Sequence, residues 1–354
     1  LCGGRHGYQA ESAGARRRGA ALAEVARECI EPTTAGEELR ERGCRCGDAC
    51  SQYGDCIAAG DVDHGAGVAG SCARGRERGD RIMSKPIRVA FSGSGFKVPA
   101  HVGALQAIAD AGYEPIEAAG TSGGSICAAL YASGMSLSDM KTLALTHDWS
   151  NMMSFSPLSA LRMRGFCDGK TLLAWMLEHT GRKTFADLAI DFTAVASNVA
   201  NEGAFEFSRA ATPDVPIGLA VRSSTSIPFV FEPVVIADAL LSDGGMVNNI
   251  PVDRLKVDDV PRLGVQLVSM ELPLKPRTRL LPHQFAMRLL DLMLSACEST
   301  HVSAAQAGGA CMAFVETGYA STLDRNMPIE IRQRLFDDGY TATKTSIESF
   351  QRLQ

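Results

Sequence analysis

The chain has 354 residues, of which 45% are hydrophobic and 21% are charged, as is typical of a globular protein that buries a core. Its formal net charge of −5 gives no electrostatic basis for binding nucleic acid, so we expect no nucleic-acid partner. No apolar run approaches the roughly 18 residues that a bilayer-spanning helix needs. Composition therefore excludes a basic nucleic-acid binder and a helical membrane protein.

Residues 1–82 differ in composition from the rest of the chain. They contain no Met, Phe, Trp or Lys, and their 12 arginines stand against 13 acidic residues. Met83 is the first methionine, and the sequence MSKPIRVAFSG that starts there is typical of the beginning of a domain. We interpret 1–82 as a disordered extension or an upstream translation of the reading frame, and 83–354 as one domain. Residues 1–82 lack the apolar region of a secretion signal, so a cytoplasmic location is expected.

Cysteines give no metal-binding pattern. Those that invite such an interpretation are Cys44, Cys46, Cys50 and Cys56. Their spacings are CxC, CxxxC and CxxxxxC, whereas zinc sites favour CxxC pairs, so we predict neither a metal nor another cofactor. The cysteines of the second segment are Cys127, Cys167, Cys297 and Cys311. They stand alone within apolar or helical patterns and are interpreted as small buried residues.

Residues 86–134 predict two strand–loop–helix units in succession. A short apolar run ends before Ser92, and a helical pattern then continues to Gly112. A second strand and a second helix follow, and the helix ends at Gly134. Further strands are predicted at 191–199, 205–208, 234–241 and 262–270, and helices at 168–180, 217–224, 283–306 and 328–352. This order favours an α/β fold with three α/β/α layers and a mainly parallel central sheet.

The second loop contains the five residues Gly120-Thr121-Ser122-Gly123-Gly124, which match G-x-S-x-G. A nucleophilic serine between a strand and a helix adopts a strained backbone, so its neighbours must be small. The turn lifts the hydroxyl to the carboxyl edge of the sheet, where the following helix presents N–H groups. We therefore predict that Ser122 is a nucleophile, with a plain glycine-rich turn as the alternative.

An activated serine needs a base. The downstream histidines are His147, His179, His283 and His301, and none lies in a predicted loop at the end of a strand. Asp243 follows the predicted strand 234–241 and precedes Gly244 and Gly245, which allow a sharp turn and keep the carboxylate accessible. Asp-Gly is also a common turn dipeptide, so a structural turn is the alternative.

The first loop, Gly93-Ser94-Gly95-Phe96-Lys97, follows the first predicted strand and opens a helix. Such a loop exposes successive backbone N–H groups, which can hold the oxyanion of a tetrahedral intermediate. A dinucleotide-binding G-x-G-x-x-G loop is the competing interpretation, and it is disfavoured because Val98 stands where the last glycine is required.

These three elements, in this order, resemble the patatin-like phospholipase family. Further stretches that look like the family are DGKTLLAWMLEHTGRKTFADL (168–188), VASNVANEGAFEFSR (195–209) and AVRSSTSIPFVFEPV (220–234). The likeness covers residues from about 90 to 270 and implies a patatin-like fold. Two residues, Ser94 and Val98, replace glycines of the family's pattern.

The resemblance implies a Ser-Asp dyad without histidine, in which Ser122 attacks an ester carbonyl and Asp243 accepts the serine proton. It assigns Gly93, Ser94, Gly95, Lys97 and Gly123 to the oxyanion and substrate site, and Gly120, Gly124, Gly244 and Gly245 to motif positions. The expected function is hydrolysis of lipid esters of the phospholipase A type. Alternatives are a soluble carboxylesterase or thioesterase, a catalytically silent scaffold, and a Ser-His-Asp hydrolase.

The expected partner is a lipid ester substrate, and the sequence gives no indication of the oligomeric state. Residues 272–290 combine apolar residues with cations, and such a segment is more often a solvated loop followed by a surface helix. Peripheral contact with an anionic membrane surface is the alternative interpretation of this segment.

Overall fold

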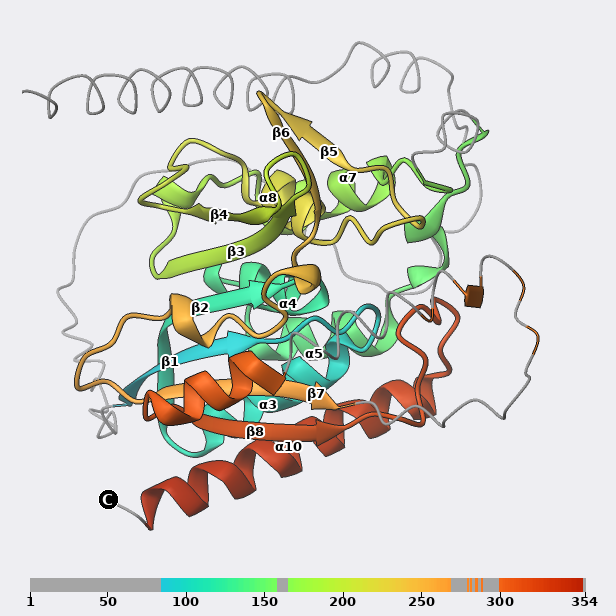
Figure 1. Ribbon diagram of the computed structural model, residues 1–354. Helices are drawn as coiled ribbons and strands as arrows, with labels where there is room; N and C mark the ends of the chain where they lie inside the picture. Colours follow the sequence, from blue (N-terminus) through green and yellow to red (C-terminus); the bar gives the residue numbers. More distant parts are fainter. Residues whose placement is uncertain are drawn as a thin grey trace, which may run out of the picture. The chain divides into compact units, whose positions relative to one another are not determined.

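One mixed β-sheet of eight strands forms the centre of the described part of the molecule (Figure 1). The computed structural model describes residues 84–157, 165–268 and 299–352, together with 279, 281, 284, 285 and 288, and all of them belong to one compact unit. The interpretations of residues 1–82, of His283 and Cys297, and of most of 272–290 lie outside the described residues.

The sheet is parallel on one side and antiparallel on the other. The strands are β1 (Lys85–Phe91), β2 (Tyr113–Thr121), β3 (Asp191–Asn198), β4 (Gly203–Ser208), β5 (Val234–Ile236), β6 (Ala239–Asp243), β7 (Arg262–Val268) and β8 (Cys311–Glu316). Their order is β5-β6-β3-β2-β1-β7-β8, and β4 pairs with β3 off this path. The run β3-β2-β1-β7-β8 is parallel, whereas β4, β5 and β6 pair antiparallel.

Helices cover both faces of the sheet. They are α3 (Val98–Asp110), α4 (Gly123–Ala132), α5 (Leu137–Thr146), α7 (Lys170–His179), α8 (Ile217–Ser224) and α10 (Ile329–Gln351). Short 3₁₀ helices are η1 (Trp149–Met153), η2 (Phe185–Asp187), η3 (Gly244–Met246) and η4 (Val252–Arg254). A further helical stretch at 299–307 lies in front of β7 and β8 in Figure 1.

The alternation of side chains along β1 explains the layers. Val89 and Phe91 belong to a large buried cluster that includes residues of α3, α4, α7, α8 and α10. Ala90 faces the other way, into a small cluster formed with η4 and the 299–307 stretch. The α/β class with a central sheet flanked by helices is therefore confirmed, with one thick and one thin helical layer.

Three features differ from the sequence-based expectation or were missed by it. The predicted strand 234–241 is a hairpin, because the chain reverses at Ala237 (φ 53°) and residues 239–243 pair back onto 234–236. Strand β8 and helix α5 were not predicted. Cys127 and Cys167 are buried, as expected, and Cys311 is partly buried.

Two features are absent from the described ranges. No helix there is long and apolar enough to cross a bilayer. No group of three or more His, Cys, Asp or Glu side chains in those ranges is arranged to hold a metal ion.

Candidate active site

Ser122 occupies a strained turn between β2 and α4. Its backbone has φ 50° and ψ −126°, a conformation that non-glycine residues rarely adopt. The turn is so tight that a Cβ atom on Gly120 would lie 2.6 Å from the carbonyl oxygen of Gly124. A Cβ atom on Gly124 would collide with the carbonyl oxygens of Phe91 and Ser92. The glycines of G-x-S-x-G are thus required by the close approach of the backbone.

The register of β3 brings Ser122 and Asp243 together. Thr121, the last residue of β2, pairs with Val195, and Asp243, the last residue of β6, pairs with Ala196. Since β4 occupies the other edge of β3, the two strands lie along the same edge and meet end to end. A side chain on Gly244 would collide with the carbonyl of Val195, so glycine is needed where the two strand ends meet.

The two side chains form a direct hydrogen bond. Ser122 Oγ donates to Asp243 Oδ2 over 2.6 Å, and the N–H of Gly245 donates to Asp243 Oδ1 over 2.8 Å. Both side chains are buried. Burial raises the pKa of Asp243 to about 6, and the hydrogen bonds from Ser122 and Gly245 counteract part of that rise. A carboxylate with this pKa can accept a proton near neutral pH.

Ser224, at the end of α8, supports the backbone of the turn and was not singled out from the sequence. Its hydroxyl accepts the N–H of Ser122 over 2.9 Å and donates to the carbonyl of Val195 over 2.5 Å. Ser226 follows closely, and its carbonyl accepts the N–H of Asp243. The stretch 220–234, noted for its resemblance to the family, was the available signal for these contacts.

The loop at 93–97 lies beside the turn, and its backbone is held by long-range hydrogen bonds. Gly93 donates its N–H to the carbonyl of Asn249 over 3.0 Å, so this amide is already engaged, contrary to its expected role as an oxyanion donor. Gly95 has φ 54°, and a Cβ atom there would collide with Thr322. Val98 is already the first residue of α3, which has proline in its first turn.

The backbone N–H groups of Ser94 and Gly95 have no hydrogen-bond acceptor among the residues that the structure describes. A Cβ atom on Gly123 would lie 2.9 Å from the Gly95 nitrogen, so the loop rests against the residue next to Ser122. The buried Nζ of Lys97 donates to Thr317 Oγ1 over 3.2 Å, while its backbone N–H donates to the Ser94 carbonyl and closes the loop.

The histidines occupy other places in the described part of the chain. His101 is fully buried and its Nε2 lies 2.9 Å from the carbonyl oxygen of Ser92, and burial lowers its pKa to about 4. His147 and His179 pack against Trp175 in a ring cluster. The hydroxyl of Ser122 therefore has a carboxylate, and not an imidazole, as its acceptor.

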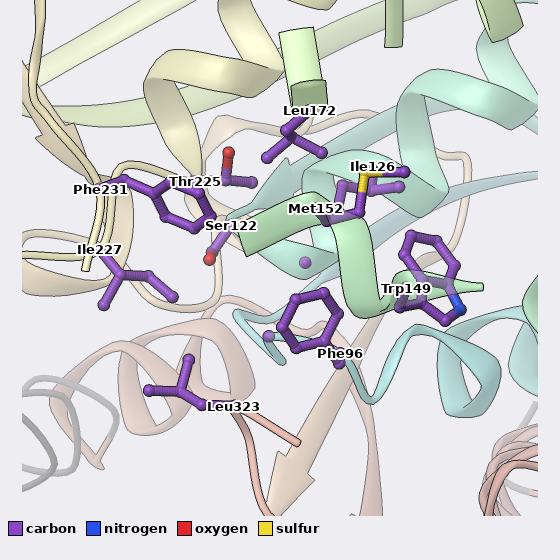
Figure 2. A pocket seen from close by; sticks show the side chains of 12 residues that line it. Phe96, Ser122, Ile126, Trp149, Met152, Leu172, Thr225, Ile227, Phe231 and Leu323 are labelled. Carbon is purple, nitrogen blue, oxygen red and sulfur yellow. The ribbon is translucent and has the colours of Figure 1, made fainter. Parts of the chain in front are cut away.

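An apolar pocket opens onto Ser122 (Figure 2). Its other lining residues are Gly95, Phe96, Gly123, Ile126, Trp149, Met152, Leu172, Thr225, Ile227, Phe231 and Leu323. Ile227 and Phe231 lie on one side of the serine hydroxyl in Figure 2, with Phe96 and Trp149 on the other. Such a lining suits a hydrocarbon chain next to the nucleophile.

This fold and site are those of an α/β protein with a serine elbow. Residues 89–256 match the model of the family described as patatin-like phospholipase. The chain belongs to this family, as its resemblance predicted.

Among its relatives, YqhO of Bacillus subtilis (strain 168) is 32% identical over 206 residues, covering 51% of this chain and 71% of that protein. An NTE family protein of Mycobacterium tuberculosis (strain H37Rv) is 27% identical over 173 residues, or 49% of this chain and 46% of the relative. The crystal structure of VipD from Legionella pneumophila aligns with a TM-score of 0.47 at 17% identity, covering 75% of this chain and 67% of VipD.

Proposed function

We propose that the protein is a serine acyl hydrolase that cleaves lipid esters through a Ser122–Asp243 dyad. The observation that carries this proposal is the 2.6 Å hydrogen bond from Ser122 Oγ to Asp243 Oδ2, made at a strained turn that opens onto an apolar pocket. Membership of the patatin-like phospholipase family supports the same reaction class.

In the first half of the reaction, Ser122 Oγ attacks the ester carbonyl carbon while Asp243, ionised above its pKa of about 6, accepts the hydroxyl proton. The carbonyl oxygen becomes an oxyanion. The amides of Ser94 and Gly95, together with the N-terminus of α4, stabilise that negative charge. The tetrahedral intermediate collapses, the C–O bond to the alcohol breaks, and Asp243 returns the proton to the leaving alcohol.

In the second half, Asp243 takes a proton from water, and the hydroxide attacks the acyl-serine. The second tetrahedral intermediate releases the carboxylic acid, and the proton returns to Ser122. Because the pocket beside Ser122 is apolar, the acyl chain of the substrate lies against Phe96, Trp149 and Phe231. Phospholipids and neutral lipid esters both carry such a chain.

A fluorophosphonate probe and an acyl-release assay across lipid classes test this proposal. Wild type is expected to be labelled and active, and both signals are lost in Ser122→Ala and Asp243→Ala. Matched controls are Ser138→Ala and Asp259→Ala, which change exposed residues elsewhere.

Three results would overturn parts of the proposal. A well-folded wild type that takes no label is a scaffold. Turnover of soluble esters or thioesters without any release from lipids makes it an esterase of another class. Activity that survives Asp243→Ala and disappears in His301→Ala requires a histidine mechanism.

A further inference from the structure

Three phenylalanine rings on adjacent backbone segments face solvent. Phe155, Phe166 and Phe229 are 64%, 56% and 57% exposed. Phe155 pairs with Cys167 in an isolated β-bridge, and the N–H of Phe166 donates to the carbonyl of Phe229 over 3.2 Å. Isolated exposed apolar residues are normal, whereas several on adjoining segments mark an interaction surface. We name Phe155, Phe166 and Phe229 the phenylalanine rim.

The phenylalanine rim adjoins the pocket that opens onto Ser122. Phe229 lies between Ile227 and Phe231, and these two residues line the pocket. The apolar lining therefore continues along the chain from the pocket to the exposed ring of Phe229.

The other two rings adjoin the pocket in the same way. Phe166 precedes Cys167, which forms a bridge with the pocket residue Phe231. Phe155 follows η1, whose residues Trp149 and Met152 line the opposite wall (Figure 2). The three rings therefore stand on segments that also supply walls of the pocket.

The backbone at Phe229 supports a functional origin for this exposure. Its φ of 66° is a genuine outlier for a bulky residue, and the strained residue holds its ring in solvent and not in the core. Both the strain and the exposed ring disfavour the free protein, so an environment that covers the ring would recover part of that free energy.

A cation lies at the same rim. Arg325 donates from Nη1 to the carbonyl of Met153 over 2.8 Å, and Met153 is two residues before Phe155. Arg325 also lies two residues after Leu323, another lining residue. Aromatic rings with a neighbouring guanidinium match a bilayer surface, where rings enter the acyl boundary and the cation meets phosphate.

We propose that the phenylalanine rim inserts into a phospholipid bilayer and sets the pocket entrance on the membrane, so that an acyl chain passes from the bilayer to Ser122. This inference rests on the proposed lipid ester hydrolysis and adds where the substrate is taken up. It is independent of residues 272–290, because the surface comes from other parts of the chain.

The test measures vesicle binding separately from catalysis. Full-length Ser122→Ala protein is sedimented with phosphatidylcholine vesicles and compared with the same protein carrying Phe155→Ser, Phe166→Ser and Phe229→Asn. Asparagine is used at 229 because it tolerates positive φ. We expect the triple change to weaken vesicle partitioning at least about 10-fold. Val257→Ser, which removes a side chain that is 73% exposed elsewhere, is the matched control and should bind like the parent.

A second measurement uses the wild-type serine. The triple variant should hydrolyse a water-soluble short-chain ester at the wild-type rate and lose activity on vesicles. Should the triple variant fail to fold, Phe155→Ser with Phe166→Ser tests the same surface.

Two outcomes would overturn the inference. One is equal vesicle binding by the parent and the triple variant. The other is a concentration-dependent dimer that the triple change abolishes, with no vesicle binding by the parent, since the rings then cover a second copy of the chain. A wild type without any hydrolase activity would contradict the proposed function alone, because vesicle binding is measured on the inactive protein.

Discussion

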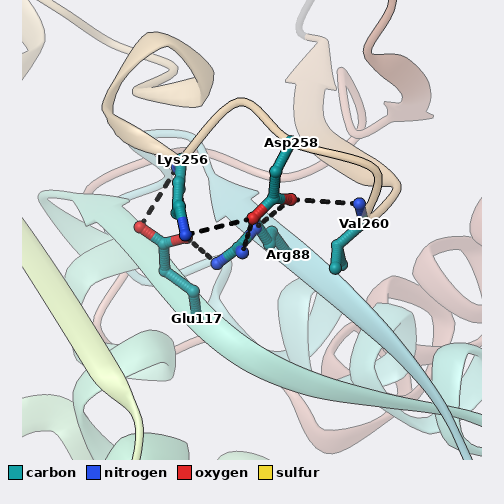
Figure 3. A network of polar contacts seen from close by, with 5 residues as sticks. All are labelled: Arg88, Glu117, Lys256, Asp258 and Val260. Atoms are coloured by element: carbon teal, nitrogen blue, oxygen red, sulfur yellow. Dashed lines mark hydrogen bonds and ion pairs between the residues drawn. The ribbon is translucent and has the colours of Figure 1, made fainter.

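Asp243 and the carboxylates that contact Arg88 lie in different parts of the sheet and in different electrostatic surroundings. Asp243 lies where β6 meets the end of β2. Its pKa is shifted by burial and by two hydrogen-bond donors. Glu117 lies on β2 and Asp258 lies before β7, and both contact Arg88 on β1 (Figure 3). Arg88 donates from Nη1 to Glu117 and from Nη2 to Asp258, each over 2.5 Å.

The difference shows what a charged partner does to a carboxylate. The hydrogen bond from Arg88, followed by the N–H of Val260, lowers the pKa of Asp258 to about 2. Burial raises the pKa of Asp243 to about 6. Paired with the Arg88 guanidinium, Asp258 stays ionised, and Arg88 joins β1, β2 and the segment before β7 through its two carboxylate partners. Without such a partner among the groups that shift its pKa, Asp243 keeps a basicity that a proton acceptor needs.

The largest contrast is expected in activity. Asp243→Asn removes the proposed proton acceptor and should lower kcat/KM by at least about 10³-fold. Asp258→Asn should leave kcat/KM within about two-fold of wild type, because it changes only the Arg88 network. Hydrolysis of a soluble ester by both variants at equal protein concentration measures the difference. Equal losses in the two variants would contradict the assigned roles.

Stability should depend more on the Arg88 network than on Asp243, the reverse of the ranking for activity. Arg88→Leu leaves the buried carboxylate of Glu117 without its guanidinium and should lower the free energy of unfolding by about 3 kcal/mol. Urea denaturation followed by circular dichroism measures this loss. The matched control is Arg334→Leu, since the Arg334–Asp338 pair is exposed and should contribute less than about 1 kcal/mol. The idea fails if both changes destabilise equally.

The two pKa shifts predict opposite pH dependences of stability. Asp243 has a pKa of about 6 when folded and 3.8 as its ordinary value, so the folded state binds more protons between these values. Its contribution therefore falls as the pH rises from about 4 to about 6, by up to roughly 3 kcal/mol. The free energy of unfolding of Asp243→Asn minus that of wild type should therefore grow across that interval and then stay constant.

Asp258 behaves in the opposite way. Because folding lowers its pKa, Asp258 stabilises the folded state above about pH 4. This contribution disappears as the pH falls toward about 2. Unfolding curves from pH 3 to 8 separate the two groups. The same Asp243 titration predicts that kcat/KM rises with pH around a midpoint of about 6. A flat kcat/KM over that range would exclude Asp243 as the proton acceptor.

The smallest expected effect concerns backbone strain at Ser122. Its φ of 50° is easy for glycine and unfavourable for alanine. Both Ser122→Gly and Ser122→Ala remove the hydroxyl, yet the glycine variant should unfold with a free energy about 1 kcal/mol higher. At Ser138 on α5, the same pair of substitutions should rank the other way, because glycine disfavours a helix.

The sequence predicted the parts of the site that local chemistry determines. The glycines around Ser122 encode a tight turn, so the elbow, its strand and its helix could all be placed. Asp243 was also singled out as the candidate base, and it lies at the end of β6 within hydrogen-bond distance of Ser122, although its strand was expected to span 234–241. The hairpin turn at Ala237 escaped notice because alanine at positive φ carries no turn signal.

Contacts set by tertiary structure could not be predicted. The amide of Gly93 was expected to be an oxyanion donor, and the structure gives it to Asn249, a residue far away in sequence. Lys97 was placed near the oxyanion, while its ammonium reaches Thr317 after β8, a strand that was not predicted. The pocket wall from Trp149 and Met152 depends on how η1 packs, which no periodicity reveals.

The end-to-end meeting of β2 and β6 along β3 also has a consequence for folding. Ser122 and Asp243 are separated by 121 positions, so a nascent chain exposes its serine long before the aspartate leaves the ribosome. Closing such a contact is slow, because the intervening chain must be ordered first. Fragments that end before β6 contain Ser122 but lack Asp243. The contact between Ser122 and Asp243 therefore forms only in chains in which β6 has paired with β3.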